Sequence, residues 1–155
     1  MKQLCLLAKP PVACGGSLNN TRHIKRTLST KNPMHLVLKS KREILFKNKD
    51  KVGKLLMKQA KKFGIKSYGY SIQKDHIHFV LRIFNREDYI KFIRAFTGLL
   101  ARLLGKGLFK FRPFTRIAHW GRDLQNLRNY LFQNDMEVYG VWDKSTRQIP
   151  AVWRF

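Results

Sequence analysis

Apolar and β-branched residues gather in three short runs, a pattern that predicts β-strands. The runs cover residues 34–39, 66–73 and 76–83. Successive side chains of a strand point to opposite faces, so the apolar positions from Ile77 to Ile83 share one face of the third run. His76 and His78 then stand side by side on the other face. A tight turn at residues 74–75 would join the second and third runs as an antiparallel hairpin.

Two longer stretches carry apolar residues at the spacing of an amphipathic helix. The first begins at a cap on Asn48 or Asp50 and ends near residue 63, where Gly64 supplies a helix stop. Its outer face carries five lysines, which form either a solvated surface or a contact to nucleic acid. The second is capped by Asn85 in a capping-box arrangement and runs to about residue 104.

A fourth strand and a third helix are predicted further along the chain. Residues 109–118 form a basic and aromatic run that fits a strand. Asp123 can cap a helix that ends near Asn134, with leucines and Phe132 on its apolar side. The order β-α-β-β-α-β-α predicts an α+β fold. We expect an antiparallel sheet with helices on one face, of the split βαβ, ferredoxin-like kind.

The composition divides the chain into three parts. Residues 1–33 mix prolines, glycines and asparagines with bases and hold no acid, which indicates a basic, partly disordered arm. Such an arm either lies along a nucleic-acid backbone or is only solvated. Residues 34–140 contain the predicted elements and form the folded domain, and residues 141–155 form a C-terminal tail.

The charge balance indicates a polyanionic partner. The 155 residues contain 32 Lys and Arg against 9 Asp and Glu, a formal net charge of +23. Only six of these bases lie in residues 1–33, so the basic character belongs mainly to the folded part. Nucleic acid is the first interpretation, because phosphates bind basic side chains with release of counterions. An anionic membrane surface is the second interpretation, and ribosome binding is the third.

Cysteine usage and hydropathy indicate a cytoplasmic protein that does not span a membrane, and of the interpretations above we expect a nucleic-acid partner and no membrane partner. The two cysteines, Cys5 and Cys14, are too few for a four-cysteine zinc site, and we expect free thiols in a reducing compartment. The apolar run at the N-terminus is short and is broken at residues 9–11, unlike a signal peptide. No stretch approaches the roughly 18 apolar residues of a membrane span.

Candidate chemistry begins with the pair of histidines. His76 and His78 can hold one divalent ion and leave positions open for a phosphate, or they can fill a polar sheet face. Tyr130 and Asn134 are neighbours on one helix face, because they are four residues apart. A tyrosine hydroxyl can act as a nucleophile, and the Asn134 carboxamide offers an oxygen ligand. Two imidazoles with an oxygen ligand favour Mg²⁺ or Mn²⁺.

These residues together resemble the single-tyrosine HUH transposases, and within them the REP-associated tyrosine transposases. The resemblance rests on His76-Ile77-His78 on a strand, followed by Tyr130 on a helix. It extends to residues 33–40 and 129–134 and covers roughly residues 15–140. The family helix commonly reads Tyr-x-x-x-Asn-Pro. Asp135 stands here in place of that proline, and we expect no consequence for the chemistry.

The resemblance implies an HUH endonuclease fold and a metal-dependent tyrosine transposase. It implies that His76 and His78 bind a divalent metal with Asn134 as third ligand, and that Tyr130 attacks a phosphate of single-stranded DNA. This attack would form a 5′-phosphotyrosine link and free a 3′-OH, and a later 3′-OH would reverse it. The family recognises DNA hairpins. The REP-associated branch favours a monomer, and a dimer that exchanges the tyrosine helix is the alternative.

Further candidates surround this constellation. Arg112 and Arg116 share a face of the fourth predicted strand and are candidate contacts to the DNA backbone. The predicted DNA-binding set is Arg112, Arg116, Lys110, Arg122 and His119. His35 lies on the first predicted strand, where packing or a phosphate contact is favoured over a role as a spare metal ligand.

Three functions are compatible with these observations. The first is the DNA transposase that cleaves and rejoins hairpin-containing DNA. The second is a catalytically silent protein, derived from a transposase, that binds DNA or structured RNA by stacking bases on aromatic side chains. The third is a small-molecule phosphotransferase of the histidine-triad kind. It is disfavoured because Val80 stands where a third histidine would alternate and because +23 exceeds what a nucleotide substrate requires.

Overall fold

The computed structural model describes residues 13–15 and 26–141 of the chain. Its elements in chain order are β1 (Ala13–Cys14), β2 (Met34–Lys39), the 3₁₀ turn η1 (Phe46–Asn48), α1 (Lys49–Lys62), β3 (Lys66–Ile72), β4 (His76–Arg82), α2 (Arg86–Leu104), β5 (Phe114–Ile117) and α3 (Arg122–Val138). These elements form an α+β arrangement around one antiparallel sheet, which confirms the predicted fold class.

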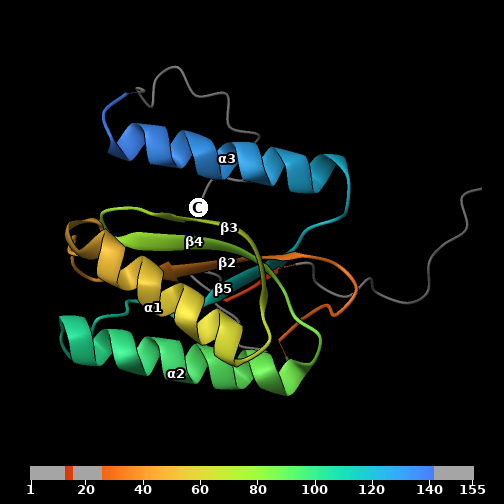
Figure 1. The fold of residues 1–155 in the computed structure, drawn as a ribbon, viewed down its shortest axis with the longest axis horizontal. Helices are drawn as coiled ribbons and strands as arrows, with labels where there is room; N and C mark the ends of the chain where they lie inside the picture. Colours follow the sequence, from red (N-terminus) through yellow and green to blue (C-terminus); the bar gives the residue numbers. More distant parts are fainter. Residues whose placement is uncertain (1–12, 16–25, 142–155) are drawn as a thin grey trace, which may run out of the picture.

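The strands follow the order β1-β5-β2-β4-β3 across the sheet (Figure 1). The strand that carries the histidine pair, β4, therefore lies between two partners. Val37 of β2 is opposite His78 on one side, and Ser71 of β3 is opposite it on the other. The predicted hairpin between β3 and β4 is confirmed, with the Gln73 N–H donating to the His76 carbonyl at 2.8 Å.

The larger hydrophobic core lies between the sheet and the two helices α1 and α2, which cover one face (Figure 1). Ile77, Phe79 and Leu81 point into it and are at most 1% exposed, as the alternation along β4 predicts. The side chain of Asn85 accepts hydrogen bonds from the N–H groups of Glu87 and Asp88, which confirms the predicted cap of α2.

The expectation that the helices share one face holds only for α1 and α2, because helix α3 covers the opposite face of the sheet (Figure 1). Leu127 and Leu131 pack against Val80 of β4 in a second, smaller core. Gly69 of β3 lies under this contact: a Cβ there would be 3.4 Å from Leu131 Cδ1, and its φ is +148°. A Cβ at this distance would be in ordinary contact, so glycine is required here by the backbone conformation. Phe132, predicted on the apolar side, is 54% exposed.

The structure differs from the expected elements at the fourth strand. The strand β5 covers Phe114–Ile117 instead of residues 109–118. Pro113 stands immediately before it and has no N–H to donate to a ladder. Upstream, Phe109 forms an isolated bridge with Ser40, and residues 110–113 are irregular. Arg112 is therefore not on the strand that carries Arg116.

Helix α3 also differs at both ends. Gly121 occupies the N-cap position, and Asp123 lies in the first turn instead of capping the helix. The carboxylate of Asp123 accepts from the His119 N–H at 2.8 Å and from Arg116. The helix continues to Val138, four residues beyond the expected end, because the first residue with a helix-stopping conformation is Gly140 at φ +71°.

The described part of the N-terminal arm is joined to the sheet. Residues 13–14 form β1, which pairs with β5, although no strand is expected there from the sequence. The Arg26 guanidinium donates to the Pro113 carbonyl at 2.5 Å and to Thr115 Oγ1 at 3.0 Å. Cys14 is half-buried. The expectations for Cys5, for the rest of the arm and for the tail from residue 142 lie outside the described residues.

Within the described ranges no helix is long and apolar enough to cross a membrane.

Candidate active site

The two histidines of β4 stand together on the face of the sheet that α3 covers. The centroids of the His76 and His78 rings are 4.7 Å apart, and the rings are nearly perpendicular. His78 is 1% exposed, whereas the His76 side chain is 31% exposed. The pair therefore has one buried member and one member at the edge of the solvent.

A third histidine lies beside the pair. His35 of β2 is fully buried, and a hydrogen bond of 2.9 Å joins its Nε2 to Nδ1 of His78. The contact is diagonal, because the residue directly opposite His35 in the ladder is Val80. Burial, together with the positive charges of Arg116 and His76, lowers the pKa of His35 from 6.5 to about 3. His35 is therefore a neutral hydrogen-bonding partner at physiological pH.

A carboxylate orients the other member of the pair. Asp75, in the turn before β4, has its Oδ1 2.6 Å from Nδ1 of His76. Burial raises the pKa of Asp75, but the hydrogen bond with His76 and the charges of His76 and Lys39 outweigh burial and hold that pKa below its usual value. Asp75 is therefore ionised, and it favours the tautomer of His76 that carries its proton on Nδ1.

Helix α3 brings the tyrosine over the histidines of the same chain. The ring centroid of Tyr130 lies 5.3 Å from that of His78 and 6.2 Å from that of His35, both edge-on. Tyr130 is 9% exposed. The predicted nucleophile and the predicted metal pair, 52 positions apart for Tyr130 and His78, thus meet in one site.

Asn134 lies one turn further along α3 and is 2% exposed. Its backbone carbonyl accepts from Gln73 Nε2 at 2.8 Å, and the same Nε2 donates to Ser71 Oγ at 2.9 Å. Ser71 Oγ in turn donates to Asp135 Oδ1 at 2.6 Å. Asp135, whose replacement of the family proline is expected to leave the chemistry unchanged, therefore helps to attach α3 to the edge strand β3. Burial raises the pKa of Asp135 despite the hydrogen bond from Ser71.

The sequence analysis does not identify the three side chains that attach α3 to the β3 edge, Ser71, Gln73 and Asp135. Ser71 could have been noticed, because the predicted hairpin places it opposite His78 and on the same face. The contact with Asp135 carries no sequence signal, because the two residues are 64 positions apart. Together these bonds determine where the C-terminal half of α3 sits, and hence where Tyr130 points.

The donor set fits a divalent metal held by His76 and His78. In each ring Nδ1 is engaged, by Asp75 in His76 and by His35 in His78, which is the outer-shell arrangement of metal-binding histidines. Each ring would then ligate through Nε2. No group of three or more His, Cys, Asp and Glu side chains suited to a metal occurs in the described ranges. The predicted third ligand is the carboxamide oxygen of Asn134.

The predicted DNA contacts fall into two groups. Lys110, Arg112, Arg122 and His119 are exposed at the surface. By contrast, the Arg116 side chain is only 11% exposed and donates from Nη2 to Asp123 Oδ1 at 2.9 Å. Arg116 therefore braces the loop before α3, and its geometry does not favour a contact to the DNA backbone.

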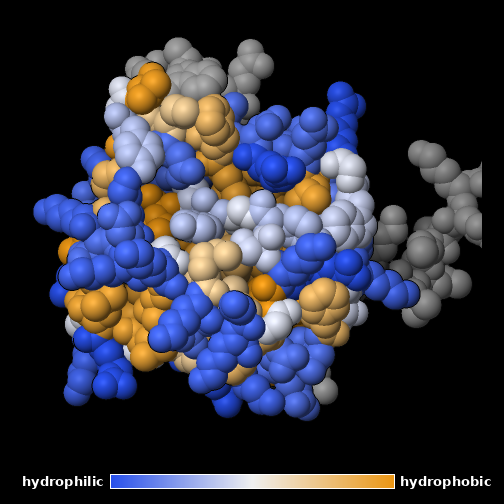
Figure 2. Space-filling view, viewed as in Figure 1, coloured by the Kyte–Doolittle hydropathy of each residue, from blue (hydrophilic) through white to orange (hydrophobic). Residues whose placement is uncertain are grey.

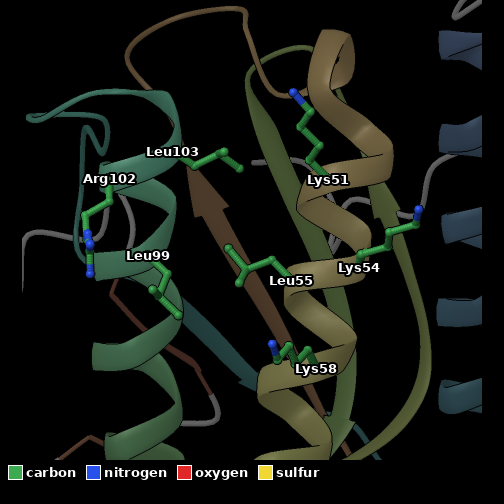
Figure 3. A pocket seen from close by; sticks show the side chains of 7 residues that line it. All are labelled: Lys51, Lys54, Leu55, Lys58, Leu99, Arg102 and Leu103. Atoms are coloured by element: carbon green, nitrogen blue, oxygen red, sulfur yellow. The ribbon is translucent and has the colours of Figure 1, made fainter.

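Two surface pockets of the described residues lie away from the histidine pair. The larger, about 580 Å³, lies between α1 and α2 on the far side of the sheet from α3, with Leu55, Leu99 and Leu103 flanked by basic side chains (Figure 3). The space-filling view in Figure 2 shows that the face containing these helices is mainly hydrophilic, with apolar patches between the charged side chains. The smaller, about 490 Å³, lies at the β3 edge and is lined by residues that include Tyr70, Asp135 and Tyr139.

The family model described as "Transposase IS200 like" matches residues 29–124. The chain belongs to the IS200-like transposase family. This membership confirms the family resemblance inferred from the histidine pair, which lies within the matched residues. Tyr130 and Asn134 lie beyond the match, so their predicted roles are not tested by it. No match was found among curated proteins.

A solved structure shares this fold. The chain is similar to a REP-associated tyrosine transposase bound to a REP hairpin, with a TM-score of 0.65, 11% identity, and coverage of 78% of this chain and 76% of that one. It also matches a putative transposase from Deinococcus radiodurans with a TM-score of 0.41, 15% identity, and coverage of 66% and 89%. At this identity the first likeness establishes the shared fold.

Proposed function

We propose that the protein cleaves and rejoins single-stranded DNA beside a hairpin through a 5′-phosphotyrosine intermediate on Tyr130. The observation that carries this proposal is the approach of Tyr130 to His78, with ring centroids 5.3 Å apart. A neighbour of the same fold is bound to a REP hairpin, which supports hairpin DNA as the substrate class. The net charge of +23 supports a polyanionic substrate independently.

The reaction is a transesterification. The Tyr130 oxygen attacks the scissile phosphorus, the bond from phosphorus to the 3′ oxygen breaks, and the leaving oxygen takes up a proton to become a 3′-OH. A second 3′-OH can attack the phosphotyrosine and restore Tyr130, so no high-energy cofactor is consumed. The buried setting of Tyr130, at 9% exposure, disfavours water as the competing attacker.

His76 and His78 would hold Mg²⁺ or Mn²⁺, with Asn134 as the candidate third ligand. A divalent metal bound there would polarise the scissile phosphate and offset the charge that develops on it. Asp75 and His35 orient the two imidazoles through their Nδ1 atoms. Because α3 carries Tyr130 over the histidines of its own chain, one subunit can supply the complete set of residues, which supports a monomer.

A covalent-adduct assay tests the proposal. The protein is incubated with end-labelled hairpins whose flanking unpaired nucleotides are randomised, in Mn²⁺, and is then run on a denaturing gel. We expect a shifted protein–DNA band that disappears with chelator and in Tyr130→Phe. Hairpin binding without any such band would contradict strand transfer and favour the alternative, a transposase-derived protein that only binds nucleic acid.

A further inference from the structure

Two large aromatic side chains lie exposed around one arginine near the end of β4. Phe84 is 59% exposed and Trp120 is 46% exposed. The Arg82 guanidinium carbon lies over both rings, 5.3 Å from the Phe84 centroid and 5.6 Å from that of Trp120. We call Arg82, Phe84 and Trp120 the aromatic platform. The two exposed rings are neighbours, because both contact Arg82, and adjacent exposed aromatic side chains are typical of a binding surface.

The platform is held in place by its own polar atoms. Trp120 Nε1 donates to the Lys31 carbonyl at 3.0 Å, and Arg82 Nε donates to the Thr30 carbonyl at 3.1 Å. The ring of Tyr68 packs edge-on against Trp120, with centroids 5.7 Å apart. The rings are therefore positioned before any ligand arrives, which lowers the entropy lost on binding.

The charge at the platform is available to an anion. Arg82 forms no ion pair within the described part of the chain, and its guanidinium contacts only π faces and a carbonyl. Lys66 Nζ lies 5.5 Å from the Tyr68 ring and adds a second positive charge beside the platform. Aromatic faces flanked by cations bind unpaired nucleobases, because every base has a π face and every linkage carries a phosphate.

The platform also lies on the same strand face as the histidine pair. Arg82 follows His78 by four residues of β4, so the two side chains point to the same side. Four strand residues span about 13 Å. This distance corresponds to about four stacked nucleotides at about 3.4 Å each. A strand stacked on the platform can therefore extend to the histidine pair beside Tyr130.

We propose that the aromatic platform stacks unpaired bases of the DNA strand whose phosphate is processed at Tyr130. The inference rests on the proposed function for the identity of the strand. It adds a binding site remote from the reacting atoms, with recognition by stacking instead of by base-edge hydrogen bonds. Such recognition tolerates different bases, so the platform would hold the strand without selecting its sequence.

The test compares two probes of equal charge. One is a fluorescently labelled twelve-nucleotide oligothymidylate, and the other is the same backbone with abasic residues throughout. Dissociation constants are measured by fluorescence anisotropy in chelator, so that neither metal nor cleavage affects the result. We expect the native protein to bind the thymidine probe at least about 5- to 150-fold more tightly, the range that stacking of a single base gives.

The variants Trp120→Leu and Phe84→Leu should reduce this ratio at least several-fold, and the double variant should bring it close to one. Their salt dependence should stay at the native slope, because no phosphate contact is removed. Trp120→Tyr, which keeps an aromatic face, should restore most of the ratio. Phe132→Leu is the matched control, because Phe132 is similarly exposed, at 54%, but lies outside the platform.

The outcomes separate this inference from the proposed function. A reduced ratio in the platform variants supports the platform even where the native protein forms no covalent adduct. A native ratio in both single variants and in the double variant overturns the platform even where the adduct forms. A native protein that binds both probes equally overturns it as well, and that measurement does not depend on the folding of any variant.

Discussion

The hydrogen bond between His35 and His78 allows a quantitative prediction about metal binding. For His78 to ligate through Nε2, its Nδ1 must carry the proton and donate to Nε2 of His35, 2.9 Å away. His35→Asn removes this acceptor, because the shorter amide does not reach as far as the imidazole Nε2. His35→Gln places its amide oxygen near the same position and should retain the bond.

The magnitude follows from the burial of both rings. His35 is 0% exposed and His78 is 1% exposed, so solvent cannot replace the lost acceptor. A buried donor left without its partner costs about 1–3 kcal/mol. At about 1.4 kcal/mol per tenfold change, His35→Asn should weaken Mn²⁺ binding roughly 5- to 150-fold. This range overlaps the roughly 10- to 100-fold effect typical of outer-shell partners.

Isothermal titration calorimetry of Mn²⁺ into the protein without DNA measures this effect independently of catalysis. His35→Gln should bind within a few-fold of the native protein, and His76→Ala should lose most of the affinity. His119→Asn, at an exposed histidine outside the site, is the control for nonspecific loss. Native Mn²⁺ affinity in a folded His35→Asn protein would refute the reasoning. So would equal weakening in the Asn and Gln variants.

Three further predictions concern stability. Gly98 is an exposed residue of α2, and an added Cβ there would have no atom within 4 Å. Gly98→Ala should therefore raise the free energy of unfolding by about 0.5–1 kcal/mol, which is measured as a higher Tm. An unchanged or lower Tm would count against this prediction. Asp135→Ala should lower the free energy of unfolding by about 1 kcal/mol in urea titrations, because Ser71 Oγ loses its acceptor, while Asp135→Asn should recover most of it. The Tyr89 hydroxyl is buried without a hydrogen-bond partner among the described residues, and burial raises its pKa from 10 to about 12. The unfolded chain therefore loses this proton first, and the free energy of unfolding falls as pH rises from 10 towards 12. Tyr89→Phe should lack that part of the fall and be at least as stable at neutral pH. An identical alkaline stability profile in both proteins would contradict this.

Local patterns were sufficient for most of the elements. The alternation along residues 76–83 predicted which side chains enter the core and which face carries His76 and His78, because the two-residue period of a strand is a local property. The cap at Asn85 was readable for the same reason, since its partners Glu87 and Asp88 are its near neighbours in the chain. The error at the fourth strand also has a local cause, because Pro113 lies within the predicted range 109–118 and has no N–H to donate to a ladder.

The site itself depends on contacts that no local pattern encodes. His35 meets His78 because β2 pairs with β4 in one particular register, and a shift of one residue would turn His35 into the core. Tyr130 meets His78 because Leu127 and Leu131 pack on Val80 above Gly69, and because Asp135 is bonded to Ser71. The sequence by itself thus determined which residues share a face of each element. Only the tertiary structure decided which faces meet, because strand register and helix placement depend on packing between segments far apart in the chain.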